Sequence, residues 1–150
     1  MCARRWADLA VGECFSTNSI TISRSDIFEF AADFDPQPYH LDAEAGDNSI
    51  FGGLCASGWH VTAVMMRQLT DTFMDQGIYL VGSSSVRHLR WLKPVLADDA
   101  LTSVISITDK FTAPEAEFDY IECQVEVDNQ HGEPVITLST SLMIGSEDSR

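Results

Sequence analysis

The stretch that decides the fold lies in the middle of the chain, where residues 56–73 read ASGWHVTAVMMRQLTDTF. Apolar side chains recur there at helical spacing, namely Trp59, Ala63, Met66, Leu69 and Phe73. Three more apolar side chains lie off that stripe, namely Val61, Val64 and Met65. Because the first half of the segment is apolar on nearly every side, it predicts a long central helix that several neighbours bury.

The residues after this segment predict β-strands. The clearest strand is 120–128, because apolar side chains alternate strictly with polar ones. Its apolar members, which we expect to face the core, are Ile121, Cys123, Val125 and Val127. Residues 128–134 have the composition of a turn, so they predict an antiparallel hairpin with residues 136–144. Further strands are predicted at residues 15–22, 84–92 and 101–107.

A shorter helix is predicted to begin after Ser23. Ser23 and Asp26 have the spacing of a capping box, in which the two side chains accept hydrogen bonds from unpaired backbone N–H groups. An apolar face follows at helical spacing, formed by Ile27, Phe30, Ala31 and Phe34. Pro36 and Pro38 then end the helix. Residues 41–53 are polar and acidic, and they predict a loop that could include a short helical turn.

The order of these elements defines the fold class. A strand, a short helix, a loop, a long helix and several antiparallel strands together form an α+β arrangement, with the helices on one face of the sheet. We therefore expect an antiparallel sheet wrapped around the central helix. The length of 150 residues predicts a single domain, 1–150, with a polar tail from about residue 145.

The composition excludes several classes of partner. The formal net charge is −14, from nine Lys and Arg against 23 Asp and Glu, so the chain should repel nucleic acids and acidic membrane surfaces. Neither a membrane-spanning run of about 18 apolar residues nor a signal peptide is visible. Four scattered cysteines without CxxC spacing favour a reducing compartment. We expect a cytoplasmic protein.

An acid and a base flank the two prolines. Asp35 and His40 are five residues apart across a turn that Pro36 and Pro38 restrain, so their side chains can converge. An aspartate beside a neutral imidazole can hold a water molecule, take its proton and return a proton elsewhere. The alternative interpretation is structural: Asp35 only closes the turn, and His40 is a satisfied, half-buried imidazole.

Metal binding and cysteine nucleophilicity are the competing interpretations of these residues. A calcium-loop spacing is matched by Asp33, Asp35, Gln37 and Glu44. Pro38 occupies the position that requires glycine, so calcium is not predicted. The histidines lack paired ligand spacing, and no metal site is expected. Cys55 is interpreted as a buried structural residue, because the sequence places no base for a thiolate there.

Three segments resemble the MaoC-like dehydratases, also called the R-specific enoyl-CoA hydratase group. The first is ITISRSDI at residues 20–27 followed by DPQPYHLD at residues 35–42. The second is FGGLCASGWH at residues 51–60, and the third is LRWLKPV at residues 89–95. The three segments occur in the order of that family and together extend over most of the chain.

This resemblance implies a hot-dog fold that usually dimerises edge to edge, with acyl-thioester sites near the subunit interface. It also implies that Asp35 and His40 activate the water that adds to a 2-enoyl-CoA or leaves an R-3-hydroxyacyl-CoA. In the family, a backbone N–H at the start of the central helix binds the thioester oxygen, and this position is Gly58 here. An N–H at a helix N-terminus suits a developing enolate. No cofactor is expected besides the CoA thioester substrate.

The chain departs from the family at two places. Gln37 stands where asparagine is frequent, and Pro36 directly follows the aspartate, so we expect altered contacts around the site and retained activity. Ser57 stands where histidine often precedes the glycine. Capping of the central helix is the favoured role for Ser57, and contact with substrate is the alternative. Gln37 and Tyr39 are also predicted to contact substrate.

The only cluster of positive charge is formed by Arg87, Arg90 and Lys93. These side chains could bind the phosphates of CoA, or they could lie on an ordinary solvated strand face. The sequence leaves both interpretations open.

The sequence therefore predicts a hydro-lyase of fatty acid metabolism that hydrates a 2-enoyl-CoA reversibly. A hot-dog thioesterase and a non-catalytic module that binds acyl thioesters are the alternatives. A homodimer or higher homo-oligomer is also predicted, because one sheet around one helix leaves a strand edge and an apolar flank open.

Overall fold

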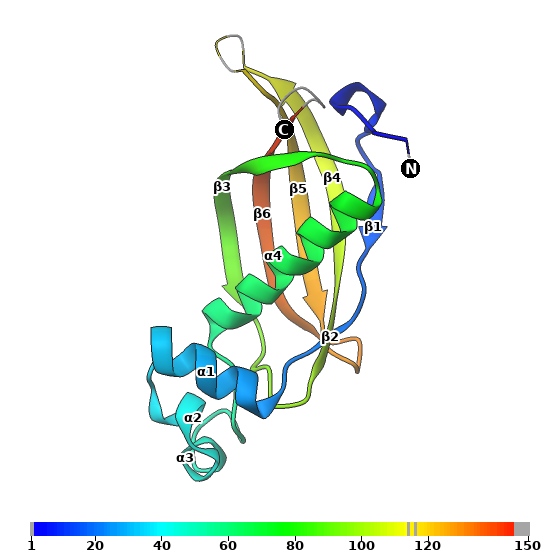
Figure 1. Ribbon diagram of the computed structural model, residues 1–150. Helices are drawn as coiled ribbons and strands as arrows, with labels where there is room; N and C mark the ends of the chain where they lie inside the picture. Colours follow the sequence, from blue (N-terminus) through cyan, green and yellow to red (C-terminus); the bar gives the residue numbers. More distant parts are fainter. Residues whose placement is uncertain (1, 114, 116, 146–150) are drawn as a thin grey trace.

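The computed structural model describes residues 2–113, 115 and 117–145 (Figure 1). The polar tail predicted for the C-terminus falls on residues 146–150, outside the described residues. After a short 3-10 turn, the elements in chain order are β1 (Cys14–Ser16), β2 (Ile20–Thr21), α1 (Arg24–Phe34), α2 (Pro38–Leu41), α3 (Ala43–Asp47), α4 (Gly58–Asp75), β3 (Leu80–Trp91), β4 (Ala100–Thr112), β5 (Asp119–Asp128) and β6 (Pro134–Ile144).

The strands form one antiparallel sheet that wraps around α4 (Figure 1). Five of its six strands follow the order β1-β4-β5-β6-β3, and the sixth, β2, pairs with β4 outside this order. The three short helices, α1 to α3, gather at the end of the sheet where α4 begins. The α+β class and the hot-dog arrangement expected from the sequence are confirmed. Among the described residues, no helix combines the length and apolar character needed to cross a membrane.

The strand predicted at 15–22 is interrupted, so that β1 and β2 are separate. Thr17 causes the interruption, because its hydroxyl oxygen accepts the backbone N–H of Ser103 at 2.9 Å in place of a strand carbonyl. β3 and β4 are longer than predicted. β3 begins at Leu80 instead of 84, and its irregular register hides the alternation that marks a strand.

The buried face of α4 differs in part from the predicted stripe. The residues that the sheet buries are Val61, Met65, Gln68, Leu69 and Phe73. The predictions for Trp59 and Ala63 are wrong, because both residues are exposed, Trp59 by 60%. Trp59 lies in the first turn of α4, where it packs edge to face against Trp91 with 5.0 Å between ring centroids.

Gln68 is a buried polar side chain whose hydrogen bonds are satisfied. Its Nε2 donates to the carbonyl oxygens of Asn18 at 2.9 Å and Leu101 at 2.8 Å. Its Oε1 accepts the hydroxyl of Ser103 at 2.6 Å. Since an unpaired buried amide would be costly, these bonds fix the register of α4 against β4 and against the segment between β1 and β2.

The start of α1 confirms the predicted capping box. The Ser23 hydroxyl accepts the N–H of Asp26 at 3.1 Å, and the Asp26 carboxylate accepts the N–H of Ser23 at 3.2 Å. The hydrogen bonds with Ser23 lower the pKa of Asp26. α1 ends at Phe34 as the prolines predict, but Pro38 then opens α2 as its first residue. The predicted loop at 41–53 contains α3 as its short helical turn.

We predict that Leu69→Ala lowers the free energy of unfolding by about 2–5 kcal/mol, because the fully buried side chain would leave a cavity between α4 and the sheet. Tm should fall by roughly 5–15 °C in a calorimetric scan. Arg67→Ala is the matched control, because Arg67 lies on the solvent side of α4 in an exposed pair with Asp71. Equal losses in both variants would contradict the packing described here.

Candidate active site

A pocket of about 260 Å³ opens at the N-terminal end of α4. Its wall combines the end of α1, α2, the segment before α4 and the end of β3. The polar and charged side chains around it are Asp35, Tyr39, His40, Cys55 and Lys93. Its large apolar walls are Phe51, Trp59, Val61, Trp91, Val95 and Val135. Segments far apart in the sequence therefore meet at one apolar pocket that contains an acid and a base.

His40 is fixed in one tautomer by a backbone carbonyl. Its Nδ1 lies 2.6 Å from the carbonyl oxygen of Cys55, and the residue is only 6% exposed. Because a carbonyl oxygen can only accept, Nδ1 carries a proton, and in the neutral ring Nε2 is left with its lone pair. This arrangement aims an unprotonated nitrogen at the carboxylate of Asp35.

Asp35 directly follows α1 as its C-cap residue, and its carboxylate is directed toward this imidazole. Asp35 Oδ2 lies 3.4 Å from His40 Nε2 and accepts a hydrogen bond from the Ser57 hydroxyl at 2.7 Å. Two acceptor atoms at this distance need a proton between them or a water molecule beside them that donates to both. The structure thus brings Asp35 and His40 together, as the turn predicted, and their catalytic roles stay a prediction.

Ser57 does not cap α4, which is the role that the sequence favours. It occupies the N-cap position of α4, but its side chain makes no capping hydrogen bond. The hydroxyl donates to the carboxylate of Asp35, and in this orientation it accepts no N–H of the first helical turn. The prediction that Ser57 caps α4 is therefore wrong, and the residue lies behind Asp35, outside the set that lines the pocket.

Gly58 opens α4 with an unpaired N–H. Among the described residues this N–H has no hydrogen-bond acceptor, as expected for a first helical residue without a side-chain cap. A Cβ atom at this position would lie 2.6 Å from Nε1 of Trp91. The indole that packs over the start of the helix therefore disfavours any side chain larger than that of glycine here.

A bulge in β3 directs Trp91 to the pocket. Between the pairs Arg87 with Ser139 and Arg90 with Thr137, β3 advances three residues and β6 advances two. The extra residue is accommodated at His88, whose φ is 54°. A regular strand of the same sequence would turn Trp91 to the outer face, whereas the bulge pairs it with the buried Ile136.

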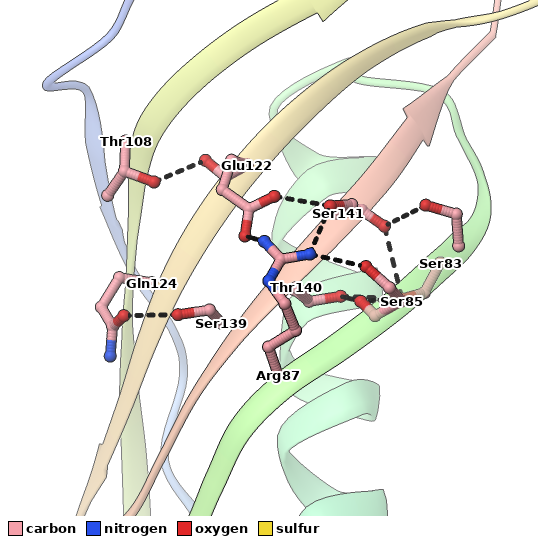
Figure 2. A network of polar contacts seen from close by, with 10 residues as sticks. Ser83, Ser85, Arg87, Thr108, Glu122, Gln124, Ser139, Thr140 and Ser141 are labelled. Atoms are coloured by element: carbon pink, nitrogen blue, oxygen red, sulfur yellow. Dashed lines mark hydrogen bonds and ion pairs between the residues drawn. The ribbon is translucent and has the colours of Figure 1, made fainter.

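The predicted cluster of cations is divided between two faces. Arg87 lies on the outer face of the sheet, where its guanidinium pairs with Glu122 and donates to Ser85 at 2.9 Å (Figure 2). Arg90 shares that face, because it pairs with the outward Thr137. Only Lys93 lines the pocket, and it pairs with Glu133 and lowers the pKa of that carboxyl.

Of the two other residues predicted to contact substrate, one lines the pocket and the other does not. Tyr39 lines the pocket and packs against Phe51 with 5.0 Å between ring centroids. Gln37 is exposed outside the pocket lining, where its backbone begins α2. The sequence reasoning did not select Phe51 or Trp91 as walls of the pocket. The LRWLKP motif is the signal that could have identified Trp91.

Cys55 lies beside the imidazole as a buried thiol. Its Sγ is 3.6 Å from His40 Nδ1, and burial raises the pKa of the thiol. It is therefore protonated at neutral pH, which agrees with the predicted structural role. In the part of the chain that the structure describes, no three His, Cys, Asp or Glu side chains are grouped to hold a metal ion. The expected independence from metals stays a prediction.

The chain is similar to known proteins in sequence and in fold. Residues 8–127 match a family model described as MaoC like domain. The MaoC-like dehydratase from Rhodospirillum rubrum is 35% identical, with a TM-score of 0.80 over 92% of this chain and 94% of that one. A Bacillus subtilis protein described as uncharacterized protein YdeM is 31% identical over 106 residues, 69% of this chain and 72% of that protein.

A more distant similarity supports the fold alone. The unliganded R-hydratase PhaJ1 from Pseudomonas aeruginosa is 24% identical, with a TM-score of 0.72 over 95% of this chain and 86% of that one. Together with the family match, these similarities confirm the resemblance that the three sequence motifs indicated.

We predict that Gly58→Ala destabilises the protein by about 1–3 kcal/mol, because the new methyl group must displace the Trp91 indole. In a Trp91→Ala background the effect should vanish or reverse, since alanine is up to about 1 kcal/mol better than glycine in a helix. Urea unfolding of the four proteins measures both effects. An equal loss in both backgrounds would show that Trp91 is not the obstacle.

Proposed function

Because this chain belongs to the MaoC-like domain family, we propose that it is a hydro-lyase that adds water reversibly to a 2-enoyl-CoA and forms an R-3-hydroxyacyl-CoA. The observation that carries this proposal is the arrangement of Asp35 and His40 beside the free N–H of Gly58. An acid–base pair and an electrophilic N–H at one apolar pocket are the parts that water addition to a thioester requires.

In the proposed reaction, a water molecule is bound by both Asp35 and His40, beside the 3.4 Å contact of Oδ2 with Nε2. His40 Nε2 accepts one proton of this water as its oxygen forms a bond to C3 of the enoyl group. The electron pair of the double bond moves toward the thioester oxygen, and the proton taken up by His40 then returns to C2, which completes the addition and restores the neutral imidazole. The reverse sequence eliminates water, so one pair of residues acts in both directions.

The start of α4 would stabilise the charge that develops on the thioester oxygen. The Gly58 N–H has no acceptor among the residues that the structure describes, and it lies at the positive end of the dipole of an 18-residue helix. A fixed donor at this place favours the enolate-like transition state over the neutral ground state. The reaction as proposed needs no cofactor besides the thioester.

The pocket lining supports an acyl substrate. Aromatic and aliphatic side chains form most of its wall, which suits the hydrocarbon part of an acyl group. For the phosphates of the CoA carrier, the proposal retains Lys93, which lines the pocket and remains partly exposed. Arg87 already pairs with Glu122, and Arg90 lies on the outer face, so their contacts with CoA stay predictions.

We predict that Asp35→Ala and His40→Ala each lower the rate of crotonyl-CoA hydration by about 10²–10⁴-fold, because each removes one member of the acid–base pair. Loss of the enoyl absorbance measures the reaction. Asp33→Ala is the matched control, because Asp33 is an exposed acid two residues earlier and lies outside the pocket lining.

Two results of this assay would contradict the proposal. Unchanged rates in both variants would remove the catalytic assignment of the pair. Release of free CoA thiol at constant enoyl absorbance would replace the hydro-lyase by a thioesterase.

We further propose that the protein acts as a homodimer. β3 is an edge strand, and two adjoining cavities of about 510 and 240 Å³ separate it from α4. Both cavities include Met66, and the apolar side chains of Met74, Val81 and Val86 are exposed beside them. A second copy placed against this edge would cover the apolar surface and the open strand together.

We predict that Val86→Asp converts the dimer to a monomer, because a carboxylate would be buried without a partner in the proposed interface. Light scattering at micromolar concentration measures the mass. Val11→Asp is the control, because Val11 is similarly exposed in the turn before β1 and lines neither cavity. A monomeric wild type, or a Val86→Asp variant that remains dimeric, would contradict the proposed interface.

A further inference from the structure

We infer that Ser57 is a positioning residue, which holds Oδ2 of Asp35 so that the other carboxylate oxygen faces the reacting water. This inference rests on the proposed function, because it assigns the support for one member of the proposed acid–base pair. It concerns a residue that the sequence placed at the helix cap and that the pocket lining does not include.

The first argument is the geometry of the carboxylate. Asp35 Oδ2 accepts the Ser57 hydroxyl at 2.7 Å and faces His40 Nε2 at 3.4 Å. Among the described residues, Asp35 Oδ1 has no hydrogen-bond partner. The carboxylate therefore has one oxygen held by the protein and one oxygen left for solvent or substrate.

The second argument is the burial of the hydroxyl. Ser57 is 1% exposed, so in the folded protein its hydroxyl bonds to Asp35 without competition from bulk water. Asp35 itself is partly exposed and ends α1, where no further helical turn restrains it. Without the hydroxyl, the carboxylate is free to rotate away from His40 toward solvent.

The third argument is that Ser57 has given up another role. A serine at an N-cap normally accepts an N–H of the first helical turn, and this one makes no such bond. Its backbone carbonyl still accepts the N–H of Val61 at 3.1 Å, so the helix starts here without the side chain. The orientation of the hydroxyl is therefore set by Asp35 and not by the helix.

The test compares kcat and KM for crotonyl-CoA in the wild type, Ser57→Ala, Ser57→Thr, Asp35→Ala and the Ser57→Ala/Asp35→Ala double variant. Ser57→Ala should lower kcat by about 10- to 100-fold with little change in KM, because misplacement of a reacting group reduces turnover more than binding. Ser57→Thr retains the hydroxyl and should restore most of kcat. In the Asp35→Ala background, Ser57→Ala should have no further effect.

A matched control separates positioning from folding. Ser141 is also buried and donates its hydroxyl to a carboxylate oxygen, that of Glu122, on the outer face of the sheet, remote from the pocket. Ser141→Ala should lower Tm and leave kcat unchanged. If Ser141→Ala reduces kcat as strongly as Ser57→Ala, the effect of Ser57 is one of stability and the inference is overturned.

Thermal unfolding of the wild type, Ser57→Ala, Asp35→Ala and the double variant tests the hydrogen bond without activity. Coupled Tm shifts for Ser57→Ala and Asp35→Ala support the bond, and additive shifts overturn the inference. A wild type that hydrates no enoyl thioester would refute the proposed function even if the Tm shifts are coupled. An active wild type with unchanged kcat in Ser57→Ala would refute the inference and leave the proposed function intact.

Discussion

The rest of the structure depends on the burial of one face of α4 in the curved sheet. Leu69 and Phe73 are fully enclosed there, and Gln68 fixes the helix along its axis by bonds to backbone carbonyls on neighbouring segments. Because these bonds fix the position of α4 along its axis, they also fix the position of its N-terminus. Asp35, His40 and Trp91 come from three other segments, and all of them are arranged around that starting point.

The features that the sequence could predict are those set by residues close to one another in the chain. The capping box at Ser23 and the alternation in 120–128 depend on neighbours in the chain, and both are observed. Ser57 and Trp59 were misjudged because their partners, Asp35 and Trp91, are distant in the sequence. Whether a serine before a helix caps it depends on how its hydroxyl is oriented, and at Ser57 a distant carboxylate sets that orientation.

The acidic surface gives the few cations specific partners. Arg87 is held on the outer face by Glu122, whose side chain is largely buried and also accepts the hydroxyl of Ser141 at 2.5 Å. Lys93 pairs with Glu133 at the pocket. Three cations within seven residues therefore do not form one positive patch, because Arg87 and Arg90 lie on the outer face of the sheet, whereas Lys93 follows β3 and lines the pocket.

β3 contains three such register shifts, near Gly82, near Ser85 and near His88, and it pairs with β6 on one side only. Each shift absorbs an additional residue without disturbing the pairs on either side of it. Relatives can therefore differ in the length of this strand and keep the same pocket wall. If a relative lacks one of these extra residues, an alignment of the two strands without gaps would exchange inward and outward positions. It would then assign the Trp91 position to the wrong side of the sheet.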